Sequence, residues 1–70
     1  MMPLVFAKSG DSFIIKKICG NPETKKHLKN LGFIVGGEVS VINENEGDMI
    51  VNVKESRIAV SKELVQQIMV

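Results

Sequence analysis

Hydrophobic residues change their spacing in the middle of the chain. Leu28 and Leu31 are spaced to lie on one face of an α-helix. Farther along, Val39 and Val41 alternate with polar residues, as in a half-buried strand. The pattern therefore predicts a helix that ends near Leu31 and a core strand that begins near Glu38.

Glycines separate these two patterns. Gly32 follows Leu31 directly and can adopt the left-handed conformation that closes a helix. Gly36 and Gly37 come just before the strand and supply a turn in which a positive φ is available. We expect Gly32, Gly36 and Gly37 to form the framework turn between the helix and the strand.

The start of the helix is equally clear. Asn21 is a favourable N-cap, Pro22 suits the first helical position, and Glu23 complements the helix dipole, so the sequence predicts a helix over Pro22–Leu31. Its expected inner side carries Thr24, His27, Leu28 and Leu31, and its expected basic outer side carries Lys25, Lys26 and Lys29. A helix this short needs to dock on the sheet to persist in water.

The other apolar positions predict short strands. Leu4–Ala7 is expected to be extended, and Ser12–Cys19 to be a longer strand with a bend near Lys16–Lys17, because its apolar residues do not follow one strict alternation. The later expected elements are strands at Glu38–Asn43, Met49–Lys54, Arg57–Val60 and Ile68–Val70, and a helical turn at Lys62–Val65 capped by Ser61. The expected connections are the polar loop Glu44–Asp48 and the two residues Glu55–Ser56.

A chain of 70 residues with these elements is expected to form one domain, residues 1–70. Two stacked sheets would need more chain, so we predict a mainly β fold with one helix. More specifically, we expect a small SH3-like barrel of five to six short strands, with the helix inserted after the first long strand.

Composition argues against a nucleic-acid partner. Nine basic residues against eight acidic ones leave a net charge of only +1, whereas a domain that binds phosphates needs a clear basic excess. There is no Trp or Tyr, and all three Phe residues are interpreted as core, so no aromatic platform for bases or proline-rich peptides is expected. The run Lys25, Lys26, Lys29 is either a solvated helix face or a docking surface for an acidic partner.

Candidate chemistry is sparse. Cys19 and His27 are the only residues of their kind, so no internal disulfide can form and a reducing compartment is expected. The two side chains could meet as half of a metal site, or they could be a buried thiol and a histidine at the helix edge. We predict no catalytic residues, no metal site within the monomer and no cofactor, and the chain is interpreted as a non-enzyme. No stretch approaches the roughly 20 apolar residues of a membrane span, so membrane contact is expected only through a partner.

Beyond these physical patterns, the strings HLKNLGFIVGGEVSVI and NVKESRIAVSKELVQQIMV resemble the FeoA family, the small cytosolic proteins of bacterial ferrous iron transport. The resemblance spans nearly the whole chain. The residues that carry it are Leu28, Leu31, Gly32, Phe33, Gly36, Val39, Val41, Ile58, Ala59, Val60, Ile68 and Val70. Many family members have Pro before the turn glycine, where this chain has Val35.

The resemblance implies a cytoplasmic SH3-like protein that binds and modulates the membrane GTPase permease for Fe(II) through its cytosolic region. The alternative is a stand-alone metal-sensing or regulatory module like the C-terminal domain of iron-dependent repressors. A third class, a small-barrel RNA binder, would be recognised by salt-dependent retention of RNA. Association with further copies of the chain is left open.

The candidate partner-binding residues lie on and just behind the helix. The barrel has to use most of its alternating Val and Ile residues for its own core, which leaves the helix as the element with a separate charged and aliphatic face. We expect Lys25 and Lys29 to form the charged rim, any exposed part of Leu28 to be an apolar anchor, and Phe33 to lie at the rim. The loop Glu44–Asp48 is the next candidate.

Overall fold

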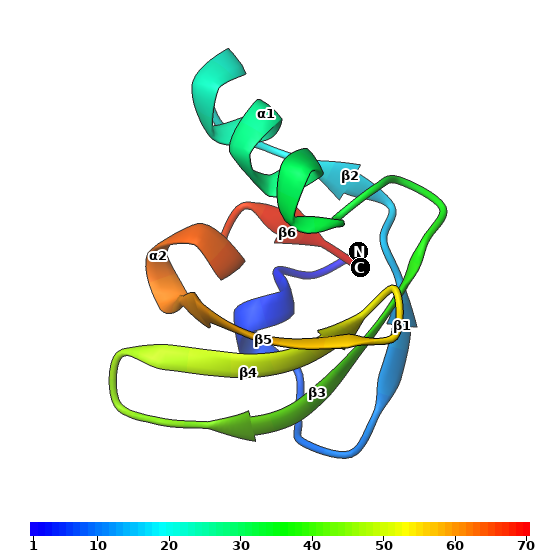
Figure 1. Cartoon of the computed structure of the whole chain (residues 1–70), viewed down its shortest axis with the longest axis vertical. Helices are drawn as coiled ribbons and strands as arrows, with labels where there is room; N and C mark the ends of the chain where they lie inside the picture. Colours follow the sequence, from blue (N-terminus) through cyan, green and yellow to red (C-terminus); the bar gives the residue numbers. More distant parts are fainter.

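The computed structural model describes all 70 residues and contains six strands, two α-helices and one 3₁₀-helix (Figure 1). The elements, in chain order, are η1 (Leu4–Phe6), β1 (Ser12–Ile14), β2 (Lys17–Ile18), α1 (Pro22–Leu31), β3 (Glu38–Glu44), β4 (Asp48–Val53), β5 (Ser56–Ser61), α2 (Lys62–Val65) and β6 (Ile68–Met69). This order agrees closely with the sequence-based expectation.

The strands form a small barrel from two antiparallel sheets. One sheet has the order β1-β3-β4-β5, and the other pairs β2 with β6. Between β1 and β2 the chain bends at Ile15 and Lys16, so one stretch of chain supplies a strand to each sheet. At this bend the Lys16 N–H donates to the Met69 carbonyl at 2.8 Å. The bend predicted near Lys16–Lys17 is therefore confirmed.

The core consists of fourteen buried residues, all of them apolar. The alternation predicted for β3 and β4 is confirmed, because their inward-facing residues are buried and their neighbours are not. The core residues are Leu4, Ala7, Ile15, Leu28, Phe33, Val39, Val41, Met49, Val51, Val53, Val60, Val65, Ile68 and Val70. Burial of this apolar surface is the main term that stabilises so small a barrel.

Helix α1 begins and ends as the sequence predicts. The Asn21 side chain accepts a hydrogen bond from the Thr24 N–H at 2.8 Å, and Pro22 occupies the first turn. At the other end Gly32 has a φ of 113°, its N–H donates to Lys29, and the Phe33 N–H donates to Leu28, both at 3.0 Å. These two bonds are the Schellman motif, which satisfies carbonyls that a helix end would otherwise leave unpaired.

The N-terminal segment differs from the expectation. Leu4–Phe6 is a 3₁₀-helix rather than an extended segment, with the Ala7 N–H donating to the Leu4 carbonyl at 2.9 Å. The physical reason is in the spacing: Leu4 and Ala7 are three residues apart, and a 3₁₀-helix places residues i and i+3 on one face. Both are buried, whereas Phe6 points outward and is 72% exposed. The interpretation of Phe6 as core is therefore wrong.

The β4–β5 connection lies one residue earlier than predicted. Lys54 and Glu55 form the turn, both with positive φ (51° and 63°), and Ser56 already belongs to β5. Two-residue hairpins favour turns of this kind because their twist matches that of the strands. Neither residue is Gly or Asn, so the sequence carries none of the usual signals for a positive φ.

The conformation of Gly32 leads to a stability prediction. Gly32→Val should destabilise the protein by more than about 1 kcal/mol, because a β-branched residue is strained at positive φ. A Cβ at this position would meet the nearest atom, Val53 Cγ1, at an ordinary contact distance of 3.6 Å, so the backbone conformation alone already accounts for a cost. For a domain of this size, thermal unfolding followed by circular dichroism should show a melting temperature lower by about 4–8 °C or more.

Gly47→Val is the matched control. Gly47 is not in the left-handed region, and a Cβ there would meet nothing within 4 Å. Its melting temperature should stay near that of the wild type. Equal melting temperatures for Gly32→Val and the wild type would show that Gly32 is not under this backbone constraint.

Candidate functional site

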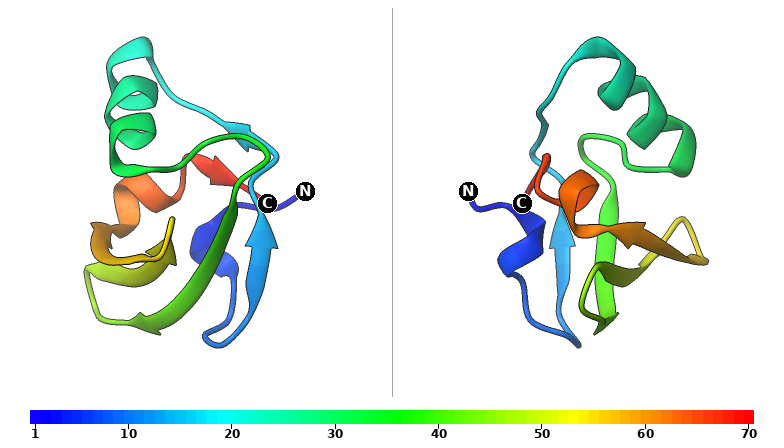
Figure 2. Two further views of the ribbon diagram at one scale, coloured as in Figure 1. Left: turned by 45° about the vertical axis from the view of Figure 1, so that its right-hand side comes forward. Right: turned by 90° about the vertical axis from the view of Figure 1, so that its left-hand side faces the viewer.

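Helix α1 lies at the outside of the barrel and is held by one buried residue. Among its ten residues only Leu28 is buried, with none of its surface exposed. The start of the helix lies near Gln67, just before β6, and its end lies near Val53 and Lys54 at the β4–β5 turn. Figures 1 and 2 show α1 projecting from the rest of the fold. Most of the helix surface is therefore available to a partner.

The exposed surface of α1 is basic. Lys25, Lys26 and Lys29 are all exposed, and at about 100° per residue they share one side of the helix. None of them forms an ion pair; the one salt bridge in the structure joins Lys62 Nζ to Glu44 Oε1 at 3.8 Å. These lysines therefore present positive charge that no acidic side chain of the chain neutralises.

Two of the four candidate binding residues are not on this surface. Leu28 is 0% exposed, which agrees with its predicted place on the inner side and leaves no exposed part to act as an anchor, and Phe33 is 1% exposed, so the expectation of Phe33 at the rim is wrong. The reason is the Schellman motif, in which an apolar residue two positions past the helix end packs near the third residue from that end. Here these residues are Phe33 and Leu28, and both join the core. In the sequence, the signal for this Schellman motif is the glycine at position 32 directly after Leu31.

Other apolar residues are exposed near the end of α1 instead. Leu31, predicted on the inner side, is 36% exposed, and the turn that follows exposes Ile34 and Val35. His27, also predicted on the inner side, is exposed. Leu28 is the only fully buried residue of α1, and Leu31 and His27 lie nearer the edge of the contact or beyond it. The apolar part of any α1 surface therefore comes from Leu31.

The turn before β3 is built by the glycines. Gly36 has a φ of 91°, and the Gly37 N–H donates to the Ile34 carbonyl at 2.8 Å. A Cβ on Gly37 would lie 3.0 Å from that carbonyl oxygen, which is too close for most residues. The Gly36 N–H also donates to the Ile15 carbonyl at 2.8 Å, which docks the turn on the bend between β1 and β2.

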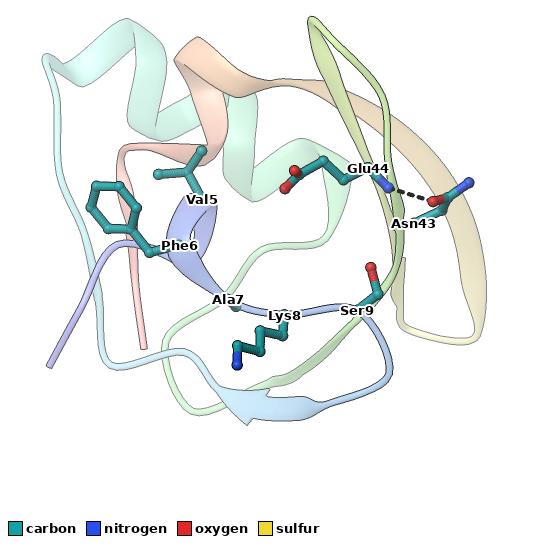
Figure 3. A pocket seen from close by; sticks show the side chains of 7 residues that line it. All are labelled: Val5, Phe6, Ala7, Lys8, Ser9, Asn43 and Glu44. Carbon is teal, nitrogen blue, oxygen red and sulfur yellow. Dashed lines mark hydrogen bonds between the residues drawn. The ribbon is translucent and has the colours of Figure 1, made fainter.

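A hollow next to η1 was not anticipated from the sequence. It has a volume of about 550 Å³ and is lined by Val5, Phe6, Ala7, Lys8, Ser9, Asn43 and Glu44 (Figure 3). The Glu44 N–H in its wall donates to Asn43 Oδ1 at 2.8 Å. A second hollow of about 380 Å³ adjoins it at Pro3, Val5, Phe6 and Gln66. The only charged side chains of the two hollows are Lys8 and Glu44, and Glu44 already pairs with Lys62.

Cys19 and His27 lie on different elements. Cys19 is half-buried just after β2, where its N–H donates to the Gln67 carbonyl at 2.7 Å, and His27 is exposed on α1. The structure holds no cluster of three or more His, Cys, Asp and Glu side chains that could hold a metal ion. None of its helices has both the length and the apolar character needed to cross a membrane.

Comparison with known proteins gives a consistent result over the whole chain. The family model described as the FeoA domain matches residues 2–70. A protein of Methanocaldococcus jannaschii named "Putative Fe(2+) transport protein A" is 37% identical over 70 residues, which are all of this chain and 85% of that protein.

Solved structures agree on the fold. A crystal structure of the Iron Uptake Regulatory Protein (FeoA) has a TM-score of 0.89 and 29% identity, covering 97% of this chain and 90% of that one. The zinc complex of FeoA from Stenotrophomonas maltophilia, described as a prokaryotic SH3 domain protein, has a TM-score of 0.85 at 20% identity, covering 99% and 88%. The predicted mainly β, SH3-like fold is thereby confirmed.

The same fold occurs inside longer proteins. The structure of ScaR with bound Cd²⁺ matches with a TM-score of 0.86 at 20% identity, covering 97% of this chain but 33% of that one. At this identity the likeness shows a shared fold and nothing further.

The burial of Leu28 leads to a prediction that separates an anchor from a contact residue. Leu28→Ala should cost about 2–5 kcal/mol, because it leaves a cavity under the one residue that holds α1. Leu31→Ala on the same helix should cost far less, since Leu31 is 36% exposed. Urea unfolding of both variants provides the measurement. Similar losses for the two would mean that α1 docks through a broader face than Leu28.

The donor set leads to a prediction about metal. Cys19 and His27 supply at most two good ligands, whereas a closed structural zinc site uses four. Elemental analysis of the purified monomer after dialysis should therefore find far less than one metal per chain. Stoichiometric zinc or iron that disappears in Cys19→Ser would contradict the prediction.

Proposed function

The chain belongs to the FeoA domain family, and on that basis we propose that it is an accessory protein of ferrous iron transport that binds the cytosolic region of a membrane Fe(II) permease through α1. The family and the name of the M. jannaschii relative support the link to Fe(II) transport. The permease as partner and the cytoplasmic location are parts of this proposal. The choice of α1 as the binding surface rests on this chain's own structure.

The observation that carries the choice of surface is the unpaired charge on α1. Lys25, Lys26 and Lys29 are exposed on a helix that contributes only Leu28 to the core. In a domain with nearly equal numbers of basic and acidic residues, such a local excess of one sign attracts an acidic partner and speeds its association. Lys25 and Lys29 therefore form the charged rim of the proposed interface.

The proposed interface is mainly electrostatic, because no exposed apolar residue of α1 shares the side that carries the lysines. Leu31 is the one exposed aliphatic residue on the helix, but at about 100° per residue it lies roughly 200° around the helix from Lys29, so it faces away from the lysines. Leu28 and Phe33 have a different role, because their burial holds α1 in place and so positions the lysines. The partner surface that suits this arrangement is acidic.

Binding rather than catalysis is the activity we propose. The single thiol and single imidazole lie on separate elements, and no carboxylate cluster accompanies either. A nucleophile needs a positioned base and an oxyanion pocket, and neither hollow beside η1 supplies them. The proposal accordingly includes no cofactor.

A second candidate function is a metal-sensing or regulatory module. The fold shared with ScaR, which is seen with bound Cd²⁺, and with a manganese-dependent transcriptional repressor favours it. The two functions differ in what they predict for the isolated domain: a sensor takes up a specific metal, whereas the accessory role needs only the permease. A titration with Mn²⁺, Fe²⁺ and Zn²⁺, followed by calorimetry, distinguishes them.

A charge-reversal experiment tests the proposed surface. The double variant Lys25→Glu/Lys29→Glu should associate with the purified cytosolic fragment of the ferrous-iron permease about tenfold more slowly or worse, because repulsion replaces steering. Its association rate should rise rather than fall as salt is added, because salt screens repulsion as well as attraction. Surface plasmon resonance at low and physiological salt provides both quantities.

The matched control is Lys8→Glu/Lys17→Glu, which makes the same change in net charge at exposed positions outside α1. It should associate nearly as fast as the wild type, and circular dichroism should show that both variants are folded. If the α1 variant is folded and binds as tightly as wild type at low salt, α1 is not the docking surface. The loop over residues 44–48 is then the next surface to test.

A further inference from the structure

Exposed apolar side chains gather where β1 turns into β2. Ile14 is 50% exposed on β1, and Val35, at the tip of the turn formed by residues 34–37, is 59% exposed. This turn is fixed to the bend by two hydrogen bonds, from the Ile15 N–H to Gly37 at 2.9 Å and from the Gly36 N–H to Ile15 at 2.8 Å. Figures 1 and 2 show the turn lying alongside the bend. Ile14, Ile34 and Val35 therefore form one exposed apolar area.

Two opposite charges accompany these residues. Glu38 is the direct partner of Ile14 in the β1·β3 register, so their side chains share the outer face of the sheet. Lys16 is exposed at the bend itself, directly after Ile15, whose backbone N–H and carbonyl hold the 34–37 turn. Both charged residues are exposed and neither forms an ion pair within the chain. We name Ile14, Lys16, Ile34, Val35 and Glu38 the β1 patch.

We propose that the β1 patch binds a second copy of the chain about a two-fold axis. In such an isologous interface each residue pair occurs twice, with residue i of one copy against residue j of the other and the reverse. Ile14 packs on Ile14 and Val35 on Val35 at the centre. Lys16 of each copy then faces Glu38 of the other, so the free charges of the monomer become two intermolecular ion pairs.

The pattern of charge favours a second copy over other occupants. An anionic membrane or an acidic protein would be attracted by Lys16 but repelled by Glu38, which borders Ile14 directly. A surface that carries both signs next to an apolar centre is complementary to itself. Lys25 and Lys29 are outside the patch, so a dimer keeps both basic helices free and could engage a partner twice.

The expected affinity is low. A standard interface buries about 800 Å² per partner, which is a large share of the 4439 Å² exposed by this small chain, and the five residues of the patch cover less. Monomer and dimer should therefore exchange, with dissociation constants on the order of 10⁻⁴ M. Sedimentation velocity over a range of concentrations up to about 1 mM is suited to this regime.

The test is a charge swap. The weight-average mass of the wild type should rise toward twice the monomer mass with concentration, and high salt should reduce this rise. Lys16→Glu alone and Glu38→Lys alone should each weaken dimerisation about tenfold or more, because like charges then face each other. The double variant Lys16→Glu/Glu38→Lys should restore it, since the pairs re-form with their signs exchanged. All measurements use the isolated chain, so the result does not depend on the permease.

Lys26→Glu is the control, because it makes the same charge change at an exposed residue of α1 that is not part of the β1 patch, and it should leave dimerisation unchanged. A wild type that stays monomeric at about 1 mM overturns the proposal. It is also overturned if the double variant dimerises no better than the single ones. A further variant, Ile14→Asp, tests a membrane as the occupant. If vesicles containing anionic phosphatidylglycerol bind the wild type but do not bind Ile14→Asp, the β1 patch is a membrane contact and the proposal is wrong.

Discussion

The closure of α1 by Gly32 is the constraint on which the rest of the structure depends. The left-handed conformation of Gly32 lets its own N–H and that of Phe33 donate to the carbonyls of Lys29 and Leu28. The same turn brings Phe33 into the core beside Leu28. A ten-residue helix is marginal on its own in water, so it persists because this end is fixed to the barrel. Full burial of a Leu side chain is worth about 1.5–3 kcal/mol, a large fraction of what a small domain has in total. One anchored end leaves the basic side of the helix in solvent, where it can meet a partner.

A second constraint is the change of sheet between β1 and β2. The bend at Ile15 and Lys16 closes the barrel with few residues, because one stretch of chain pairs with β3 on one side and with β6 on the other. Ile15 is buried at this corner and also provides the backbone groups on which the 34–37 turn docks. Exposed apolar side chains from β1 and from the 34–37 turn therefore lie near this corner. They remain outside because the small core is already filled by fourteen residues.

The two surfaces differ in their physical character. Helix α1 presents three exposed lysines on one side, which suits a fast and transient contact with an acidic partner. The β1 patch carries both signs around an apolar centre, which suits association with itself. Because the two surfaces share no residue, one copy can use both at once. The hollows beside η1 have neither a charge of one sign nor two free charges of opposite sign. Their two charged side chains, Lys8 and Glu44, are of opposite sign, and Glu44 is already paired with Lys62.

The sequence alone determined the elements that depend on local chemistry. The cap at Asn21, the stop at Gly32, the Ser61-capped turn and the alternation in β3 and β4 all follow from neighbouring residues, and each is observed. Only the tertiary structure decided which apolar residues are inside. Phe33 and Leu28 are buried while Leu31, Ile14 and Phe6 are exposed, although all five have large apolar side chains. The reason is that a core of this size has a limited volume, and the relative placement of helix, bend and turn decides which side chains reach it.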